Sequence, residues 1–212
     1  MRLRAGLIAT ILSLLEVVYS IKLLYYRDLA RLIRSFRFAR STGISLADFI
    51  ALFTHVTLRK PAFILELGAG QSSAVIALAT LTYDGAKKFV AVEENSEWLN
   101  HHREIIPSDL AKGIKLELIS VEVSDQYGSR AAKYVSIPRL PYEFVHIDGP
   151  DHDRVDAKIT CDILDLLPYL APHCIVIFDG REASARFAQP HLEQAGFRLR
   201  RNFFTLSHEF VR

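Results

Sequence analysis

From residue 62 onward, short apolar runs rich in β-branched residues alternate with stretches of helical periodicity, and this alternation limits the possible folds more than any other feature. The apolar runs begin at residues 62, 87, 114, 142 and 173 and read AFILEL, KKFVAVE, IKLELISVEV, YEFVHID and HCIVIFD. Helices are expected after four of them, over about residues 72–81, 97–106, 153–170 and 183–195. Strands and helices that alternate at this spacing predict a parallel sheet with helices on both faces.

The C-terminal end breaks this alternation. The last 15 residues, RLRRNFFTLSHEFVR, contain two short strand-like segments around Ser207 and His208. Two such segments so close in sequence predict an antiparallel hairpin at the edge of the sheet.

Charge is distributed unevenly along the chain. Residues 1–60 carry ten lysines and arginines against three acidic residues, a net charge of +7, whereas residues 61–212 carry −5. This asymmetry predicts a helical arm over residues 1–60 and a catalytic or binding domain over residues 61–212. Half of the 212 residues are hydrophobic and 24% are charged, a balance that excludes disordered and collagen-like chains.

The predicted arm begins with 17 residues, from Ala5 to Ile21, in which Glu16 is the only charge. This run is at the short limit for spanning a bilayer. It also imitates a signal peptide, but cleavage is disfavoured because the domain that follows calls for a cytosolic cofactor.

A basic amphipathic helix is expected next. Arg27, Arg31, Arg34 and Arg37 follow at spacings of three and four, with apolar residues between them. One interpretation is contact of residues 1–40 with the inner face of a membrane, by a cytoplasmic protein that is anchored or peripheral there. The other is packing of the apolar side against the domain or a second subunit. The preceding apolar run favours the interpretation as membrane contact. Nucleic acid is not an expected partner, because no nucleic-acid recognition motif accompanies the arginines.

A second helix of the arm is marked by its first residues. Ser45 and Asp48 match a capping box, which predicts a helix through about residue 58, and Lys60-Pro61 ends it. His55 is interpreted as a partly buried residue of this helix without a chemical role.

Acidic residues recur where the predicted strands end. In an open parallel sheet, ligands bind at the carboxyl ends of the strands. The segments at these ends are residues 66–73, 93–94, 124–127, 148–152 and 179–182. Four of the five begin with an acid, which indicates a polar site.

The turn after the first strand reads Glu66-Leu-Gly68-Ala-Gly70-Gln-Ser72-Ser73. Gly68 and Gly70 allow a tight turn and a close approach of the backbone to a ligand. A dinucleotide-binding turn would have a third glycine at position 73, and its pyrophosphate would be poorly served by an acid at position 66. An acid there suits a ligand that carries an ammonium and a sulfonium group.

The sequence resembles class I S-adenosylmethionine-dependent methyltransferases. The resemblance rests on the Glu66 turn, on VAVE ending at Glu93, on VHIDGPDH over residues 145–152 and on IVIFDG ending at Gly180. It covers roughly residues 60–210 and implies an α/β fold: a three-layer, Rossmann-like sandwich whose mostly parallel seven-stranded sheet has the order 3-2-1-4-5-7-6. The C-terminal hairpin fits that order, and the N-terminal helical extension lies outside it.

The resemblance also implies a cofactor, S-adenosylmethionine, and residues that bind it. Gly68 and Gly70 would make room for it, Glu66 would lie near its methionine amino group, and Glu93 would accept hydrogen bonds from both ribose hydroxyls. Glu94 is expected to point elsewhere. Two further candidates are Ser72, which otherwise caps a helix, and Asp125, which is placed at the adenine edge but is equally well an ordinary surface acid.

Methyl transfer requires alignment, and an acceptor hydroxyl also requires a base. Asp148, His152 and Asp179 follow the fourth and fifth strands and are the acid/base candidates, although His152 is almost as well explained as a helix N-terminal residue. His146 is expected to be a packed core residue.

No metal is assigned to this end of the sheet. Some relatives bind a divalent cation with an Asp-Asn pair after the fifth strand, where this sequence has Asp179-Gly180. Arg154 and Arg181 are more simply explained as partners of adjacent acids than as a clamp for an acidic substrate.

The leading functional hypothesis is methyl transfer to an oxygen or nitrogen of a small-molecule, glycan or lipid-linked acceptor. A noncatalytic Rossmann-fold scaffold attached through its arm is the first alternative. An NAD-dependent oxidoreductase is the second, and Ser73, Glu66 and the C-terminal hairpin count against it.

Overall fold

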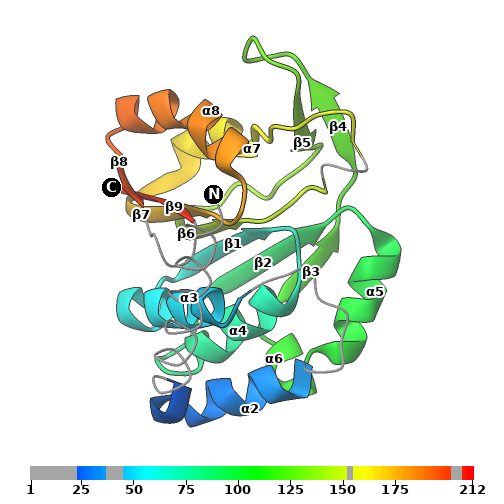
Figure 1. Cartoon of the computed structure of the whole chain (residues 1–212), viewed down its shortest axis with the longest axis vertical. Coiled ribbons are helices and arrows are strands. Elements are labelled where there is room, and N and C mark those ends of the chain that lie inside the picture. The colour runs from blue at the N-terminus through cyan, green and yellow to red at the C-terminus, as the bar shows by residue number, and fades with distance from the viewer. Residues whose placement is uncertain (1–22, 37–44, 152–154, 202–206) are drawn as a thin grey trace, which may run out of the picture.

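The computed structural model describes residues 23–36, 45–151, 155–201 and 207–212. A seven-stranded sheet forms the middle layer (Figure 1). Helices from the N-terminal half cover one face, and α7 and α8 cover the other. The predicted apolar run, Arg37, His152 and Arg154 lie outside the described residues.

The order of the strands confirms the predicted topology. The sheet runs β3-β2-β1-β6-β7-β9-β8, and β9 pairs antiparallel with both of its neighbours while the other pairs are parallel. With the strands outside this sheet left uncounted, the order is 3-2-1-4-5-7-6. The strands are β1 (Phe63–Leu67), β2 (Lys88–Glu93), β3 (Lys115–Leu118), β6 (Tyr142–Ile147), β7 (Leu170–Phe178), β8 (Arg198–Arg201) and β9 (His208–Val211).

The prediction of one strand over residues 114–123 was wrong. That segment divides into β3 and β4 (Val121–Ser124), and β4 pairs antiparallel with β5 (Ala131–Tyr134) in a separate hairpin. Its apolar residues are not all core residues, since the side chain of Leu118 is 54% exposed. Asp125 therefore lies at the turn of this hairpin, where its carbonyl accepts from the Gly128 N–H, and not at the end of a strand of the main sheet.

The prediction of a helix over residues 153–170 was also wrong in extent. The helix α7 (Asp162–Leu166) is one turn long, and a 3-10 turn (Leu167–Tyr169) leads from it directly into β7. The buried Asp162 carboxylate explains the late start, because it accepts from the Tyr134 N–H at 2.7 Å and from the Thr160 hydroxyl at 2.5 Å. These bonds hold the residues before α7 against β5.

The capping box is confirmed at the start of α3 (Leu46–Arg59). The Ser45 hydroxyl accepts from the Asp48 N–H at 3.2 Å, and Asp48 Oδ2 accepts from the Ser45 N–H at 2.8 Å. The helix ends at Lys60, whose φ of 52° is left-handed. Further helices of this half are α4 (Gln71–Thr80), α5 (Ser96–Ile105) and α6 (Ser108–Ala111), and α8 (Glu182–Gln194) lies on the opposite face.

The basic amphipathic helix packs on the domain. It is α2 (Arg27–Ser35), and its buried Leu29 and Leu32 belong to the same hydrophobic cluster as α3, α4 and the sheet. Its arginines are exposed. This observation supports packing against the domain, the interpretation that was not favoured from the sequence. Within the described ranges, no helix has the length and apolar character needed to cross a membrane.

We predict that α2 contributes to the stability of the domain. Replacing the fully buried Leu29 by alanine should lower the free energy of unfolding by about 2–5 kcal/mol, because a cavity forms against α4. Leu24→Ala, at a side chain that is 71% exposed, should change it by less than about 0.5 kcal/mol. Denaturant titration of both variants measures this, and equal, small effects would mean that α2 is an independent appendage.

Candidate functional site

The turn after β1 is held between the two neighbouring strands. The Gly68 and Ala69 N–H groups donate to the Val92 carbonyl at 2.9 and 3.1 Å, and the Gly149 N–H donates to the Leu67 carbonyl at 2.6 Å. Gly68 has a φ of 88°, and a Cβ atom there would lie 2.5 Å from the Gly149 nitrogen. The loop after β6 thus fills the space beside Gly68, and a residue with a side chain would not fit at position 68.

Open space is found at Gly70, the residue before α4. A Cβ atom there would meet only the Ser72 hydroxyl, at 3.6 Å. Ser72 and Ser73 follow in the first turn of α4, where the Ser73 N–H donates to the Gly70 carbonyl at 3.0 Å. The Trp98 indole N–H, from α5, donates to the Ala69 carbonyl at 2.8 Å and fixes the turn from the other side.

Glu93 ends β2 beside this turn. Its side chain is nearly buried and accepts from the Asn95 N–H at 2.9 Å. Burial, and then the charge of Glu94, raise its pKa to about 8, although backbone N–H groups that include that of Ala69 partly offset the rise. Glu94 instead accepts from the Tyr134 hydroxyl at 2.8 Å and the Asp151 N–H at 2.7 Å. Glu93 is therefore the acid that faces the glycine turn.

Glu66 points into the layer between the sheet and the helices. It is fully buried, its Oε2 accepts from the Ser73 hydroxyl, and its Oε1 lies 3.2 Å from His146 Nδ1. The Ser73 hydroxyl in turn accepts from the Gly70 N–H at 3.1 Å. Both oxygens of Glu66 are thus engaged by the protein, and its contact with a methionine amino group stays a prediction.

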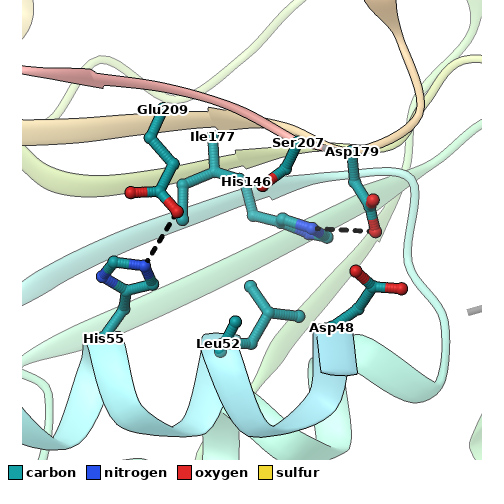
Figure 2. A pocket seen from close by; sticks show the side chains of 9 residues that line it. Asp48, Leu52, His55, His146, Ile177, Asp179, Ser207 and Glu209 are labelled. Carbon is teal, nitrogen blue, oxygen red and sulfur yellow. Dashed lines mark hydrogen bonds and ion pairs between the residues drawn. The ribbon is translucent and has the colours of Figure 1, made fainter. Parts of the chain in front are cut away.

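His146 joins Glu66 to Asp179. It lies opposite Glu66 in the β1–β6 register, and its Nε2 is 3.7 Å from Asp179 Oδ2 (Figure 2). Burial lowers the pKa of His146, but the nearby carboxylates of Asp179 and Glu66 outweigh burial and raise it to about 10. His146 is a core residue, as expected, but it lies between two carboxylates that favour its protonated form.

Asp148, directly after β6, is the third acid of this end of the sheet. Its side chain is 38% exposed, yet partial burial of the carboxyl group raises its pKa to about 7, although the charges of His146 and Arg181 partly offset the rise. The Arg181 guanidinium lies 3.8 Å from the carboxylate and donates to the carbonyls of Asp148 and Pro150. Arg181 therefore pairs with the adjacent loop, as the simpler interpretation predicted.

A small cavity lies between the first turn of α3 and the ends of β6 and β7 (Figure 2). It has a volume of about 10 Å³. Its polar lining includes Asp48, whose position at the site nothing in the sequence indicated, since α3 was assigned to the arm. His55 and Glu209, 3.2 Å apart, line it as well.

The structure therefore brings together most of the predicted residues. At the carboxyl ends of β1, β2, β6 and β7 lie Glu66, Gly68, Gly70, Ser72, Glu93, Asp148 and Asp179. Asp125 lies apart on the β4–β5 hairpin, and its contact with adenine stays a prediction. Within the part of the chain that the structure describes, no cluster of His, Cys, Asp or Glu is arranged to hold a metal ion.

Comparison with known proteins identifies the fold. No family model matches the sequence, and no curated protein matches it. A putative caffeoyl-CoA O-methyltransferase from Staphylococcus aureus is similar in structure, with a TM-score of 0.59 over 92% of this chain and 98% of that one, at 13% identity. An O-methyltransferase from Bacillus cereus, solved in complex with SAH, has a TM-score of 0.53 over 87% and 90% of the two chains, at 14% identity.

A methyltransferase from Geobacter sulfurreducens is also similar, with a TM-score of 0.52 over 88% of this chain and 89% of that one, at 14% identity. All three likenesses cover nearly the whole of both chains. The chain thus has the Rossmann-like fold of these methyltransferases, as the resemblance implied.

We predict that the charge of His146 stabilises the fold. His146→Gln leaves Glu66 and Asp179 buried without a cation, which should lower the free energy of unfolding by about 3–5 kcal/mol. The double variant Glu66→Gln, His146→Gln removes both charges and should recover part of this loss. Denaturant titration of the two single variants and the double variant gives the coupling energy, and purely additive effects would contradict an ionic interaction.

Proposed function

We propose that this chain is an S-adenosylmethionine-dependent methyltransferase that transfers a methyl group to an oxygen or nitrogen of an acceptor molecule. The observation that carries the proposal is Glu93, a nearly buried carboxylate that ends β2 beside the glycine turn of a methyltransferase fold. A carboxylate accepts hydrogen bonds at two oxygens and so matches the two hydroxyls of a ribose. The fold alone would not require an acid there.

The residues around the turn fit the rest of such a cofactor. Gly70 leaves open space, Ser72 and the first N–H groups of α4 offer hydrogen bonds, and Trp98 holds the turn in place. The bound cofactor would supply an electrophilic methyl group. The protein would then mainly align the acceptor with that methyl group.

Asp148 and Asp179 are proposed as the groups that receive a proton from the acceptor. They follow the neighbouring strands β6 and β7, and a pKa near 7 suits Asp148 to proton transfer at neutral pH. His152 stays a candidate for the same role. The acceptor is proposed to be a small molecule, a glycan or a lipid-linked compound. The similar proteins from Staphylococcus aureus and Bacillus cereus are named O-methyltransferases, which supports oxygen as the methylated atom.

Binding of S-adenosylhomocysteine, the demethylated cofactor, should depend on the charge of Glu93. The ribose hydroxyls donate to the ionised carboxylate, so binding favours ionisation of a group whose pKa is about 8 in the free protein. Affinity should therefore rise by up to about tenfold per pH unit between pH 6 and 8 and level off above. Calorimetry across this range measures the affinity.

Glu93→Gln is the matched variant for this experiment. It should bind S-adenosylhomocysteine more weakly and without the pH dependence. Glu94→Gln should keep the dependence but shift it to lower pH, because the charge of Glu94 helps to raise the pKa of Glu93. Full affinity in Glu93→Gln would refute the ribose assignment. Binding of NAD alone would favour the oxidoreductase, and binding of neither compound would favour the scaffold.

Membrane contact through residues 1–40 is a separate proposal. It is supported by the apolar run of the sequence and by the exposed arginines of α2, whereas the apolar side of α2 is already packed on the domain. The full chain should float with anionic vesicles, and deletion of residues 1–22 should abolish flotation while leaving α2 in place. Flotation unchanged by the deletion would refute an anchor in that segment.

A further inference from the structure

The cavity beside Asp179 has a polar wall and an apolar wall, and Ala51, Leu52 and Ile177 form the apolar one. Asp48, His146 and Asp179 lie close together at its wall (Figure 2). A volume of about 10 Å³ holds one water molecule, or one hydroxyl group of a larger molecule.

His146 supplies a donor that the described residues do not satisfy. Its ring is fully buried, and Nε2 makes no hydrogen bond within the described part of the chain. The separation of 3.7 Å from Asp179 Oδ2 is too long for a hydrogen bond, and a gap of this kind between polar atoms is commonly bridged by an oxygen. Each ring nitrogen of His146 faces a carboxylate, Glu66 at Nδ1 and Asp179 at Nε2, and this placement favours a ring with a proton on both nitrogens. A protonated Nε2 needs an acceptor as its partner.

Asp48 supplies an acceptor at the same place. Its Oδ2 is held by the Ser45 N–H at 2.8 Å and the Ser45 hydroxyl at 2.6 Å, as the capping box requires. Its Oδ1 is buried and makes no hydrogen bond to any described residue. Burial raises the pKa of Asp48, the bonds from Ser45 partly offset this, and the charge of Asp179 raises it further.

A group that both accepts and donates hydrogen bonds meets both requirements, and in about 10 Å³ a hydroxyl is the smallest such group. An ammonium offers donors alone and would face the N–H of His146, whereas a carboxylate or phosphate would face Asp48 and Asp179. An apolar group would leave all three side chains unsatisfied. A hydroxyl accepts from His146 and donates to a carboxylate. The remaining charged groups of the wall, His55 and Glu209, contact each other at 3.2 Å.

We propose that this cavity binds a hydroxyl group of the methyl acceptor, with its oxygen at His146 Nε2 and its proton directed to Asp48 Oδ1. The inference rests on the proposed function, because it takes the carboxyl ends of β6 and β7 as the acceptor side. It makes Asp48, on α3, an acceptor-binding residue. In the free protein a water molecule would take the place of the hydroxyl.

Three probes of one shape test the chemistry of the site: benzyl alcohol, protonated benzylamine and ethylbenzene. Each is titrated into the full chain saturated with S-adenosylhomocysteine and followed by NMR. Benzyl alcohol should bind about tenfold more tightly than ethylbenzene, the ratio expected for one hydrogen bond to a charged group. Asp48→Ala should remove most of this preference.

Ser45→Ala is the matched control for Asp48→Ala. It breaks the same capping box, but the Ser45 N–H still holds Asp48 Oδ2, so the preference for benzyl alcohol should remain. A crystal soaked with benzyl alcohol should show its oxygen within hydrogen-bond distance of His146 Nε2.

Three outcomes would overturn the inference: tighter binding of benzylamine, no loss of preference in Asp48→Ala, or a water molecule alone in the cavity of the soaked crystal. Binding of S-adenosylhomocysteine, measured first in the same samples, tests the proposed function by itself. If it binds and the probes are not distinguished, only the assignment of the cavity fails.

Discussion

An imidazolium buried between two carboxylates connects the halves of the candidate site. Glu66, His146 and Asp179 come from three neighbouring strands, and none of them is stable in that layer with an unpaired charge. His146 has a carboxylate on each side, so its ring links Glu66 of β1 to Asp179, the residue after β7. The glycine turn is tied to the same set, since Ser73 bonds both to Glu66 and to the Gly70 N–H.

The structure gives different roles to Glu66 and Glu93, two acids that the sequence analysis had both assigned to cofactor binding. Glu66 and Glu93 both end their strands near the turn, but Glu66 faces inward and is consumed by internal bonds, whereas Glu93 faces the turn with a raised pKa. The register explains the difference, because Glu66 lies opposite His146 on the face covered by α3 and α4. One acid therefore builds the site, and the other is available to a ligand.

The fold was largely predictable from the sequence because its strands are continuous apolar runs. The order of the sheet followed from the resemblance and from the C-terminal hairpin. The errors arose where apolar residues are not core residues, as at Leu118 in the divided segment, and where a polar contact stops a helix, as at Asp162. Neither the exposure of Leu118 nor the partner of Asp162 can be read from local periodicity.

The residues of the candidate site were also predicted only in part, because a local sequence pattern does not show contacts with residues far away in the sequence. Position at a strand end identifies Glu93, Asp148 and Asp179, but it carries no information about side chains that reach the site from elsewhere. His146 was correctly placed in the core, yet its charge depends on Glu66, which is 80 positions away in the sequence. The sequence explained Asp48 completely by its capping box, and only the structure shows that its second oxygen is buried and that the residue lines the cavity.

The packing of the N-terminal helices has a consequence for how such a site is assembled. The loops that follow parallel strands meet at one edge of the sheet. The order of the strands does not determine which helix covers the face of the sheet next to that edge. Here α3 covers it and brings Asp48 to Asp179, so the cavity exists only when α3 is docked. The residues that hold α3 and α2 in the core, among them Leu29 and Val56, therefore determine whether the cavity forms, although they do not line it.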